Sequence, residues 1–138
     1  MQALDTNVLV RFLVADDPVQ AGQVRNLLKR AEAEGRAYFV PLPVVLETIW
    51  VLQSVYDIGR EDILDALHRL MLMPVLAFDR QDALDRCLHA AREDKRDLAD
   101  LLIGHAALDA GCSTVLTFDR RAASGAPFTL LTAEGDTA

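Results

Sequence analysis

The chain has 138 residues, 51% of them hydrophobic, so it can bury the core of one ordinary domain without disulfide bonds. Its 21 acidic and 14 basic residues give a net charge of −7, which argues against the broad basic surface of most nucleic-acid-binding domains. No leader pattern precedes Ala3, and no apolar run approaches the roughly 20 residues of a membrane span, so we expect a cytoplasmic protein without a membrane partner.

The first half of the chain alternates short apolar runs with helix-forming patterns. In order, it predicts a strand at residues 2–4, helices at 8–14 and 17–35, a strand at 38–40, and helices at 43–54 and 63–71. The start of the second helix is well marked, because Asp17 can cap it, Pro18 suits its first turn and Gln20 has capping-box spacing.

The second half follows the same alternation. It predicts strands at residues 75–77, 114–117 and 128–131, with helices at 84–91 and 96–110 between the first two. Short strands that are apolar on both faces, alternating with helices, are typical of a parallel sheet covered on both sides. The predicted fold class is therefore α/β, a three-layer α/β/α sandwich. Without a repeat or linker, residues 1–131 are predicted to form one domain, followed by a loose polar tail at 132–138.

Four acidic residues are predicted near one edge of this sheet, where open parallel sheets bind ligands. Asp5 directly follows the first strand, and Glu47 lies in the first turns of the helix after the second strand. Asp100 lies in the first turns of the helix before the fourth strand, and Asp119 follows that strand by two residues. Four neighbouring carboxylates repel one another, and a divalent cation relieves this repulsion. Oxygen ligands without His or Cys favour Mg²⁺, or Mn²⁺, over zinc.

Each of these acids also has a purely structural interpretation. Asp5 and Asp119 suit turns that follow strands. Glu47 and Asp100 interrupt nearly continuous apolar helices, where an unpaired charge is costly and a buried salt bridge is the structural alternative. Asp97 stands at a helix start, where the helix dipole favours an acid, so its structural interpretation is the stronger one.

Histidine and cysteine supply no competing site. His68, His89 and His105 are well separated, and none stands in a nucleophile motif. Cys87 and Cys112 lack metal-ligand spacing, so both are expected to be small core residues. No glycine-rich phosphate loop follows a strand.

The four acids lie in four sequence contexts that occur together in one family. These contexts are Leu-Asp-Thr-Asn-Val-Leu-Val at residues 4–10, Pro43-x-x-x-Glu47, Asp-Leu-Ala-Asp-Leu-Leu-Ile at 97–103, and Leu-Thr-Phe-Asp-Arg at 116–120. In order and separation they resemble PIN domains, most of all the VapC toxins of VapBC toxin–antitoxin systems. The resemblance spans almost the whole chain. It implies a mostly parallel five-stranded sheet, a divalent metal site and endoribonuclease activity.

The resemblance also assigns roles to individual positions. Asp5, Glu47, Asp100 and Asp119 match the acidic quartet of the family, so they are the predicted catalytic and metal-binding residues. The supporting positions are polar Asn7 and Thr117 and the accessory acid Asp97. After the last acid the family often has a further acid and an aromatic residue, whereas residues 121–122 here are Arg and Ala.

The mechanism and partners that the resemblance implies can be stated in the same way. One or two Mg²⁺ ions would activate a water that hydrolyses the RNA backbone and leaves a 5′-phosphate, with Glu47 orienting the water. A VapC-type protein would form a homodimer and bind a cognate antitoxin, whose C-terminal segment lies in a groove near the acids. The apolar residues 49–52 and 70–73 would line that groove, unless they serve ordinary core packing.

Three other interpretations remain open from the sequence. The first is a PIN nuclease that processes RNA without an antitoxin. The second is a phospho-acceptor signalling domain, but such domains have paired acids after the first strand and a late lysine. Here Thr6 and Asn7 follow Asp5, and no lysine follows Lys95. The third is a non-catalytic binding module, against which the complete quartet argues.

Overall fold

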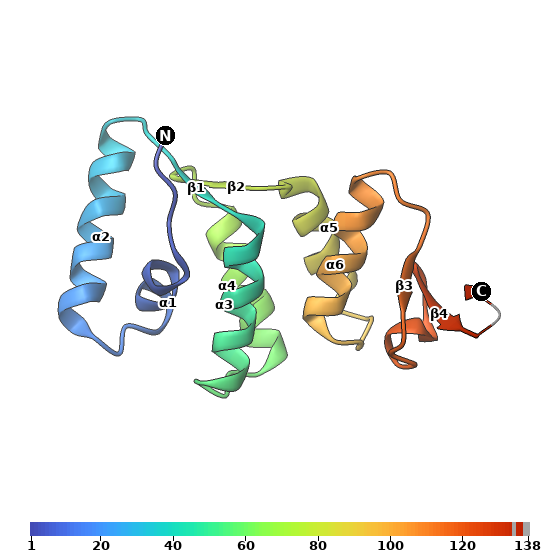
Figure 1. Ribbon diagram of the computed structural model, residues 1–138. Helices are drawn as coiled ribbons and strands as arrows, with labels where there is room; N and C mark the ends of the chain where they lie inside the picture. Colours follow the sequence, from blue (N-terminus) through green and yellow to red (C-terminus); the bar gives the residue numbers. More distant parts are fainter. Residues whose placement is uncertain (134, 137–138) are drawn as a thin grey trace. The chain divides into compact units, whose positions relative to one another are not determined.

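Helices and short strands alternate along the chain, as Figure 1 shows for this computed structural model. The structure describes residues 1–133 and 135–136, and the chain divides into two units, Met1–Gln81 and Asp82–Ala138. Each unit has its own small sheet. Among the described residues, no helix is long and apolar enough to cross a membrane.

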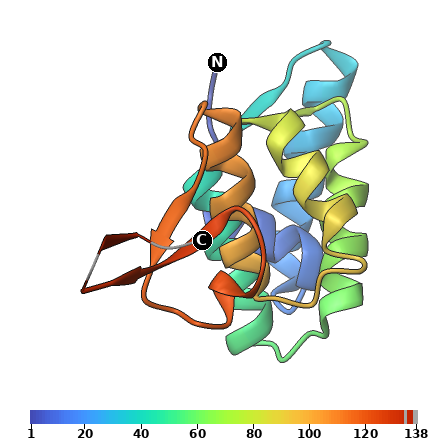
Figure 2. The same cartoon turned by 90° about the vertical axis from the view of Figure 1, so that its right-hand side faces the viewer.

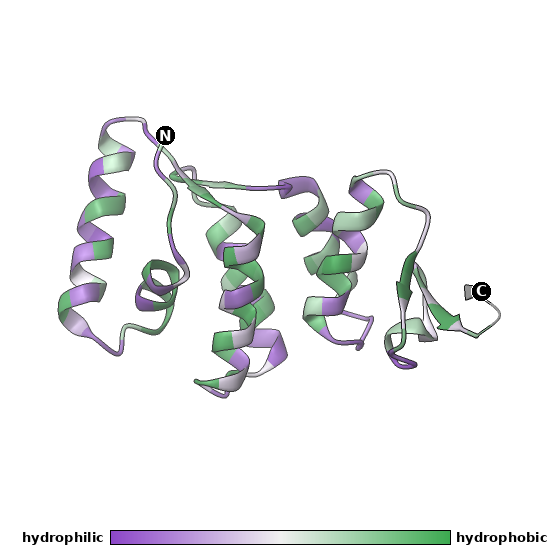
Figure 3. Ribbon diagram, in the orientation of Figure 1, coloured by the Kyte–Doolittle hydropathy of each residue, from purple (hydrophilic) through white to green (hydrophobic). Residues whose placement is uncertain are grey.

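The first unit holds four helices and a pair of parallel strands. Its elements are α1 (Thr6–Val14), α2 (Pro18–Ala33), β1 (Tyr38–Val40), α3 (Leu42–Ser54), α4 (Arg60–Met71) and β2 (Leu76–Phe78). Helix α1 packs against α2 and α3, and α4 packs against α3 and β2. The predicted capping of α2 is confirmed, because the Asp17 side chain accepts a hydrogen bond from the Gln20 backbone N–H at 3.1 Å. Hydrophilic and hydrophobic residues alternate along α2 (Figure 3).

The predicted first strand is reduced to a single bridge. Ala3 pairs with Phe39 in parallel, through hydrogen bonds from Leu4 N to Phe39 O and from Phe39 N to Gln2 O, both 2.9 Å. Strand β1 therefore lies between residues 2–4 on one side and β2 on the other, with Phe39 opposite Ala77. The chain leaves this bridge at Asp5, which caps α1, so α1 begins two residues earlier than the sequence predicted.

The second unit combines two helices with a three-stranded sheet. Its elements are α5 (Gln81–Ala90), whose first residue belongs to the first unit, α6 (Leu98–Asp109), β3 (Val115–Thr117), a 3₁₀ turn η1 (Ala122–Ser124), β4 (Phe128–Thr132) and β5 (Gly135–Asp136). Strands β3 and β4 are parallel, and β5 pairs antiparallel with β4. Figure 2 shows α6 beside the β3–β4 pair. Gly104 permits this packing, because a Cβ atom there would lie 3.0 Å from the Phe128 ring and 3.1 Å from Pro127.

The α/β fold class is confirmed, but the predicted continuous five-stranded sheet is not what the described residues form. They form one sheet of two strands and another of three. Four of these five strands have only two or three residues, so few hydrogen bonds join each pair of strands. The apolar pattern of such short strands does not specify which strand pairs with which. Part of the predicted tail belongs to the three-stranded sheet, since Thr132 ends β4 and residues 135–136 form β5. Residues 134, 137 and 138 lie outside the described residues.

Candidate active site

Asp5 lies where the chain turns from the bridge at Ala3 into α1. Its Oδ1 atom accepts a hydrogen bond from the Thr6 backbone N–H at 2.7 Å, and its backbone carbonyl accepts one from Val8 N at 3.1 Å. The side chain is exposed, and its second carboxylate oxygen accepts no hydrogen bond from the described residues. Asp5 thus serves the turn and still presents an oxygen that is free to bind a ligand.

Glu47 lies one turn into α3, and its environment differs from the sequence-based expectation. The side chain is exposed, whereas the adjacent Thr48 and Ile49 are buried. It forms no ion pair within the described part of the chain. The structural alternative of a buried salt bridge is therefore wrong, because the helix turns Glu47 to the surface while its neighbours face inward. Its carboxylate is free to bind a cation or a water.

Asp119 is held firmly by the turn that follows β3. Its backbone N–H donates to the Thr117 hydroxyl at 3.0 Å. Its Oδ1 atom accepts hydrogen bonds from Arg121 N at 2.8 Å and Ala122 N at 3.2 Å, at the start of η1. The turn interpretation and the ligand interpretation are thus compatible, since these bonds occupy only one of the two carboxylate oxygens.

The surrounding structure changes the titration of Asp100. It lies in the first turn of α6, where Asp97 caps the helix by accepting a hydrogen bond from Asp100 N at 3.0 Å. Partial burial raises the pKa of Asp100, the negative charges of Asp97 and Asp119 raise it further, and Arg96 opposes them. The second unit therefore brings Asp97, Asp100 and Asp119 into one electrostatic cluster, which a cation would stabilise.

This raised pKa predicts a pH-dependent effect of replacing Asp100. A raised pKa in the folded state stabilises the fold below the ordinary value of 3.8, and this contribution is lost as pH rises through the folded value. At neutral pH the ionised Asp100 is therefore unfavourable without metal, and Asp100→Asn should raise the melting temperature by about 2 °C or more. The advantage should vanish below pH 3.8, where the native side chain is also neutral. Calorimetry in EDTA between pH 3 and pH 8 would measure it, and a stabilisation independent of pH would contradict this account.

Arg96 connects the Asp100 helix to the segment that carries Asp119. Its guanidinium lies 5.9 Å from the centre of the Phe128 ring and also binds Asp94 at 2.7 Å. It donates hydrogen bonds to three backbone carbonyls of the η1–β4 segment, those of Ala122 (2.7 Å), Gly125 (2.6 Å) and Ala126 (2.7 Å). Nothing in the residue pattern distinguishes Arg96 from the other 11 arginines, so this role was not predicted from the sequence.

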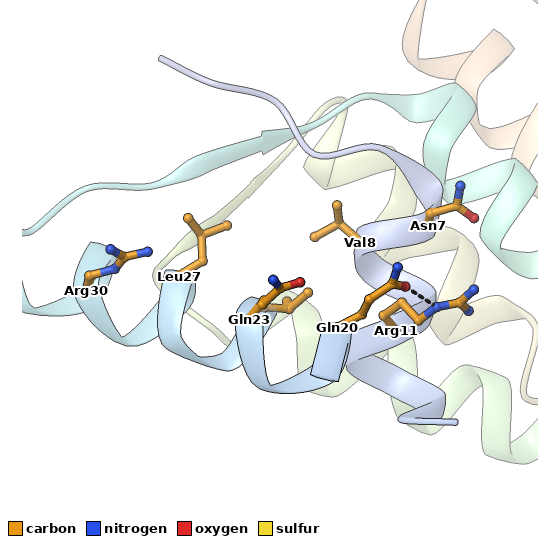
Figure 4. Close-up of a pocket in the computed structure, with 8 residues that line it drawn as sticks. Asn7, Val8, Arg11, Gln20, Gln23, Leu27 and Arg30 are labelled. Carbon is orange, nitrogen blue, oxygen red and sulfur yellow. Dashed lines mark hydrogen bonds between the residues drawn. The ribbon is translucent and has the colours of Figure 1, made fainter. Parts of the chain in front are cut away.

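Two residues next to Asp5 also bear on the site. Asn7 is exposed and lines a cavity between α1 and α2 (Figure 4). Thr6 is 5% exposed, and its hydroxyl oxygen is buried without a hydrogen-bond partner in the described residues. A buried hydroxyl without a partner is unfavourable, so Thr6 marks a polar position that the sequence analysis did not single out.

The donor chemistry fits a hard divalent cation, although each unit supplies only part of the predicted quartet. Asp5 and Glu47 belong to the first unit, and Asp100 and Asp119 to the second. Within the described residues, no three His, Cys, Asp or Glu side chains form a group that could hold a metal ion. Carboxylate oxygens suit Mg²⁺ or Mn²⁺, and the repulsion around Asp100 is the kind that a bound cation relieves.

The cysteine prediction holds for one residue only. Cys87 is buried in α5 as expected. Cys112 is exposed, which corrects the expectation of a core position. It follows Gly111, whose φ of +93° turns the chain away from the end of α6 before β3 begins. Neither cysteine forms a disulfide.

Two comparisons with known proteins find similarity over most of the chain. The profile of the PIN domain matches residues 3–126, a range that contains Asp5, Glu47, Asp100 and Asp119. The protein named VapC ribonuclease from Aquifex aeolicus (strain VF5) is 23% identical over 121 residues, which are 88% of this chain and 89% of that protein. No solved structure matches the chain significantly.

Proposed function

This chain belongs to the PIN domain family, and from that premise we propose that it is a metal-dependent endoribonuclease of the VapC type. The observation that carries the proposal is the cluster of Asp97, Asp100 and Asp119, in which partial burial and then the neighbouring negative charges raise the pKa of Asp100. Perturbed carboxylates of this kind are a feature of functional sites. The family match leaves no support for the alternative of a phospho-acceptor signalling domain.

We further propose that both units form one PIN domain, residues 1–131, with a single mostly parallel five-stranded sheet. The profile of the PIN domain spans both units, from residue 3 to residue 126, and supports this proposal.

The chain's own residues would then divide the work of the site. Asp5 and Asp100 would be direct ligands of a divalent cation, and Glu47 and Asp119 would bind it directly or through water. When bound, this cation supplies a water of lowered pKa and neutralises charge on the phosphodiester. Glu47 would orient the attacking water, while Thr117 holds the turn at Asp119 and Arg96 holds the η1 segment that follows it. Asp97 caps the helix that presents Asp100.

The proposed partners follow from the VapC likeness. RNA would be the substrate and the cytoplasm the site of action. A homodimer and a cognate antitoxin would complete the toxin–antitoxin system. Of the apolar stretches considered for the antitoxin groove, Trp50 and Leu72 are 60% and 68% exposed, whereas Ile49, Leu52 and Leu70 are buried. Only the exposed residues are available to a partner, and the buried ones serve core packing.

Cleavage of labelled RNA by the purified chain tests the proposed function. We expect cutting with Mg²⁺ or Mn²⁺, none with EDTA, and products that carry a 5′-phosphate. Labelled RNAs of several different sequences should be used as substrates. Cutting that persists in EDTA, or products with a 3′-phosphate, would contradict the proposed mechanism.

A further inference from the structure

A cavity of about 530 Å³ lies between α1 and α2, on the same side of α1 as Asn7 (Figure 4). Its walls combine three amide side chains, two arginines and three aliphatic residues, namely Asn7, Gln20, Gln23, Arg11, Arg30, Val8, Val24 and Leu27. Asn7 lies at one end of the view and Arg30 at the other. A second hollow, lined by Gln23, Asn26, Lys29 and Arg30, adjoins the first through the two residues that they share.

The charge on this surface is opposite to that of the chain as a whole. Helix α2 carries three cations, Arg25, Lys29 and Arg30, and a single acid, Glu32, although 21 of the chain's 138 residues are acidic. Lys29 and Arg30 are exposed and form no ion pair with the described residues. A surface of unpaired cations on a protein of net charge −7 favours an anionic ligand.

Arg11 is fixed in the cavity by its neighbours. Its Nε atom donates to Gln20 Oε1 at 2.7 Å, the bond drawn in Figure 4, and one terminal nitrogen donates to Tyr56 Oη at 3.3 Å. The same nitrogen lies 3.4 Å from an Asp16 carboxylate oxygen. Asp16 balances the charge of Arg11. The unbalanced positive charge therefore comes from Lys29 and Arg30.

From these observations we propose that the two hollows bind single-stranded RNA beside the cleavage site, an inference that rests on the proposed nuclease function. Lys29 and Arg30 bind backbone phosphates, and the amides around the cavity form hydrogen bonds with exposed base edges. Arginine side chains also stack on unpaired bases, a role open to Arg30 in a cavity that has no aromatic lining residue. Asn7 connects this surface to Asp5, which precedes it by two residues.

RNA binding measured without metal tests this surface separately from catalysis. Fluorescence anisotropy of a labelled single-stranded RNA in EDTA would compare the unmodified chain with the double variant Lys29→Gln/Arg30→Gln. We expect the variant to bind about tenfold more weakly. Its affinity should also depend less steeply on salt. In a plot of the logarithm of the binding constant against the logarithm of the salt concentration, the slope should be shallower by about 1.4 for two lost phosphate contacts. The matched control is Arg69→Gln/Arg86→Gln, which removes two exposed cations that lie outside α2 and line neither hollow.

Each outcome decides the proposal. Equal weakening by both double variants would show only an effect of net charge and would overturn it, as would the absence of RNA binding by the unmodified chain. Polyglutamate that competes as well as RNA would reassign the surface to an acidic protein segment. The chain could bind RNA without metal through Lys29 and Arg30 and yet never cut RNA. This result would support RNA binding by this surface and refute the nuclease function.

Discussion

Asp5→Asn and Asp100→Asn should each lower the rate of Mg²⁺-dependent RNA cleavage by about 1,000-fold or more, equivalent to about 4 kcal/mol of transition-state stabilisation. Both substitutions keep the size of the side chain and remove a charged oxygen ligand. The two residues belong to different units, so equal losses would show that both units contribute to one site. Initial rates at saturating metal, with circular dichroism to verify folding, would measure the effect.

Exposed acids of each unit provide matched controls for this experiment. Asp62 lies in the first turn of α4 and Asp82 in the first turn of α5, and both are exposed. Asp62→Asn and Asp82→Asn make the same chemical change away from the proposed site and should leave cleavage within about twofold, as surface substitutions usually do. If Asp100→Asn retained activity while Asp5→Asn lost it, the second unit would not supply a metal ligand and the quartet would be wrong.

The local structure could be predicted from the sequence because its determinants lie close together along the chain. Asp17 and Pro18 fix the start of α2, and Gly111 follows the end of α6 with a positive φ. The strands at residues 38–40 and 128–132 were predicted from their apolar runs to within one residue. The pairing of residues 2–4 with β1 requires contacts between distant segments, and the sequence pattern does not specify them.

The candidate site shows the same division between local and distant determinants. The positions of Asp97, Asp100 and Asp119 at helix starts and turns follow from short motifs, and the structure brings these three together. The exposure of Glu47 could not be predicted, because α3 is apolar on most of its surface and the face that turns outward depends on packing against α1 and α4. Arg96 was missed for a related reason, since its carbonyl partners lie 26 to 30 residues away.

Leu102→Ala should lower the free energy of unfolding by roughly 2–5 kcal/mol, because it leaves a cavity where a fully buried side chain of α6 now packs. For a chain of this length, the melting temperature should fall by roughly 6 to 20 °C. Leu108→Ala is the control in the same helix, and its side chain is 45% exposed, so its effect should be much smaller.

The Leu102→Ala variant tests whether destabilising the second unit also destabilises the first. Trp50 is the chain's single tryptophan and lies in α3 of the first unit, so its fluorescence reports unfolding there, while far-ultraviolet circular dichroism reports helices of both units. If residues 1–131 form one cooperative domain, Leu102→Ala in the second unit should lower both transitions equally. A Trp50 transition that stays in place while part of the helical signal melts earlier would show two independent domains. The carboxylates of Asp5 and Asp100 would then belong to two domains that unfold independently. The proposal that they form one site would lose its structural basis.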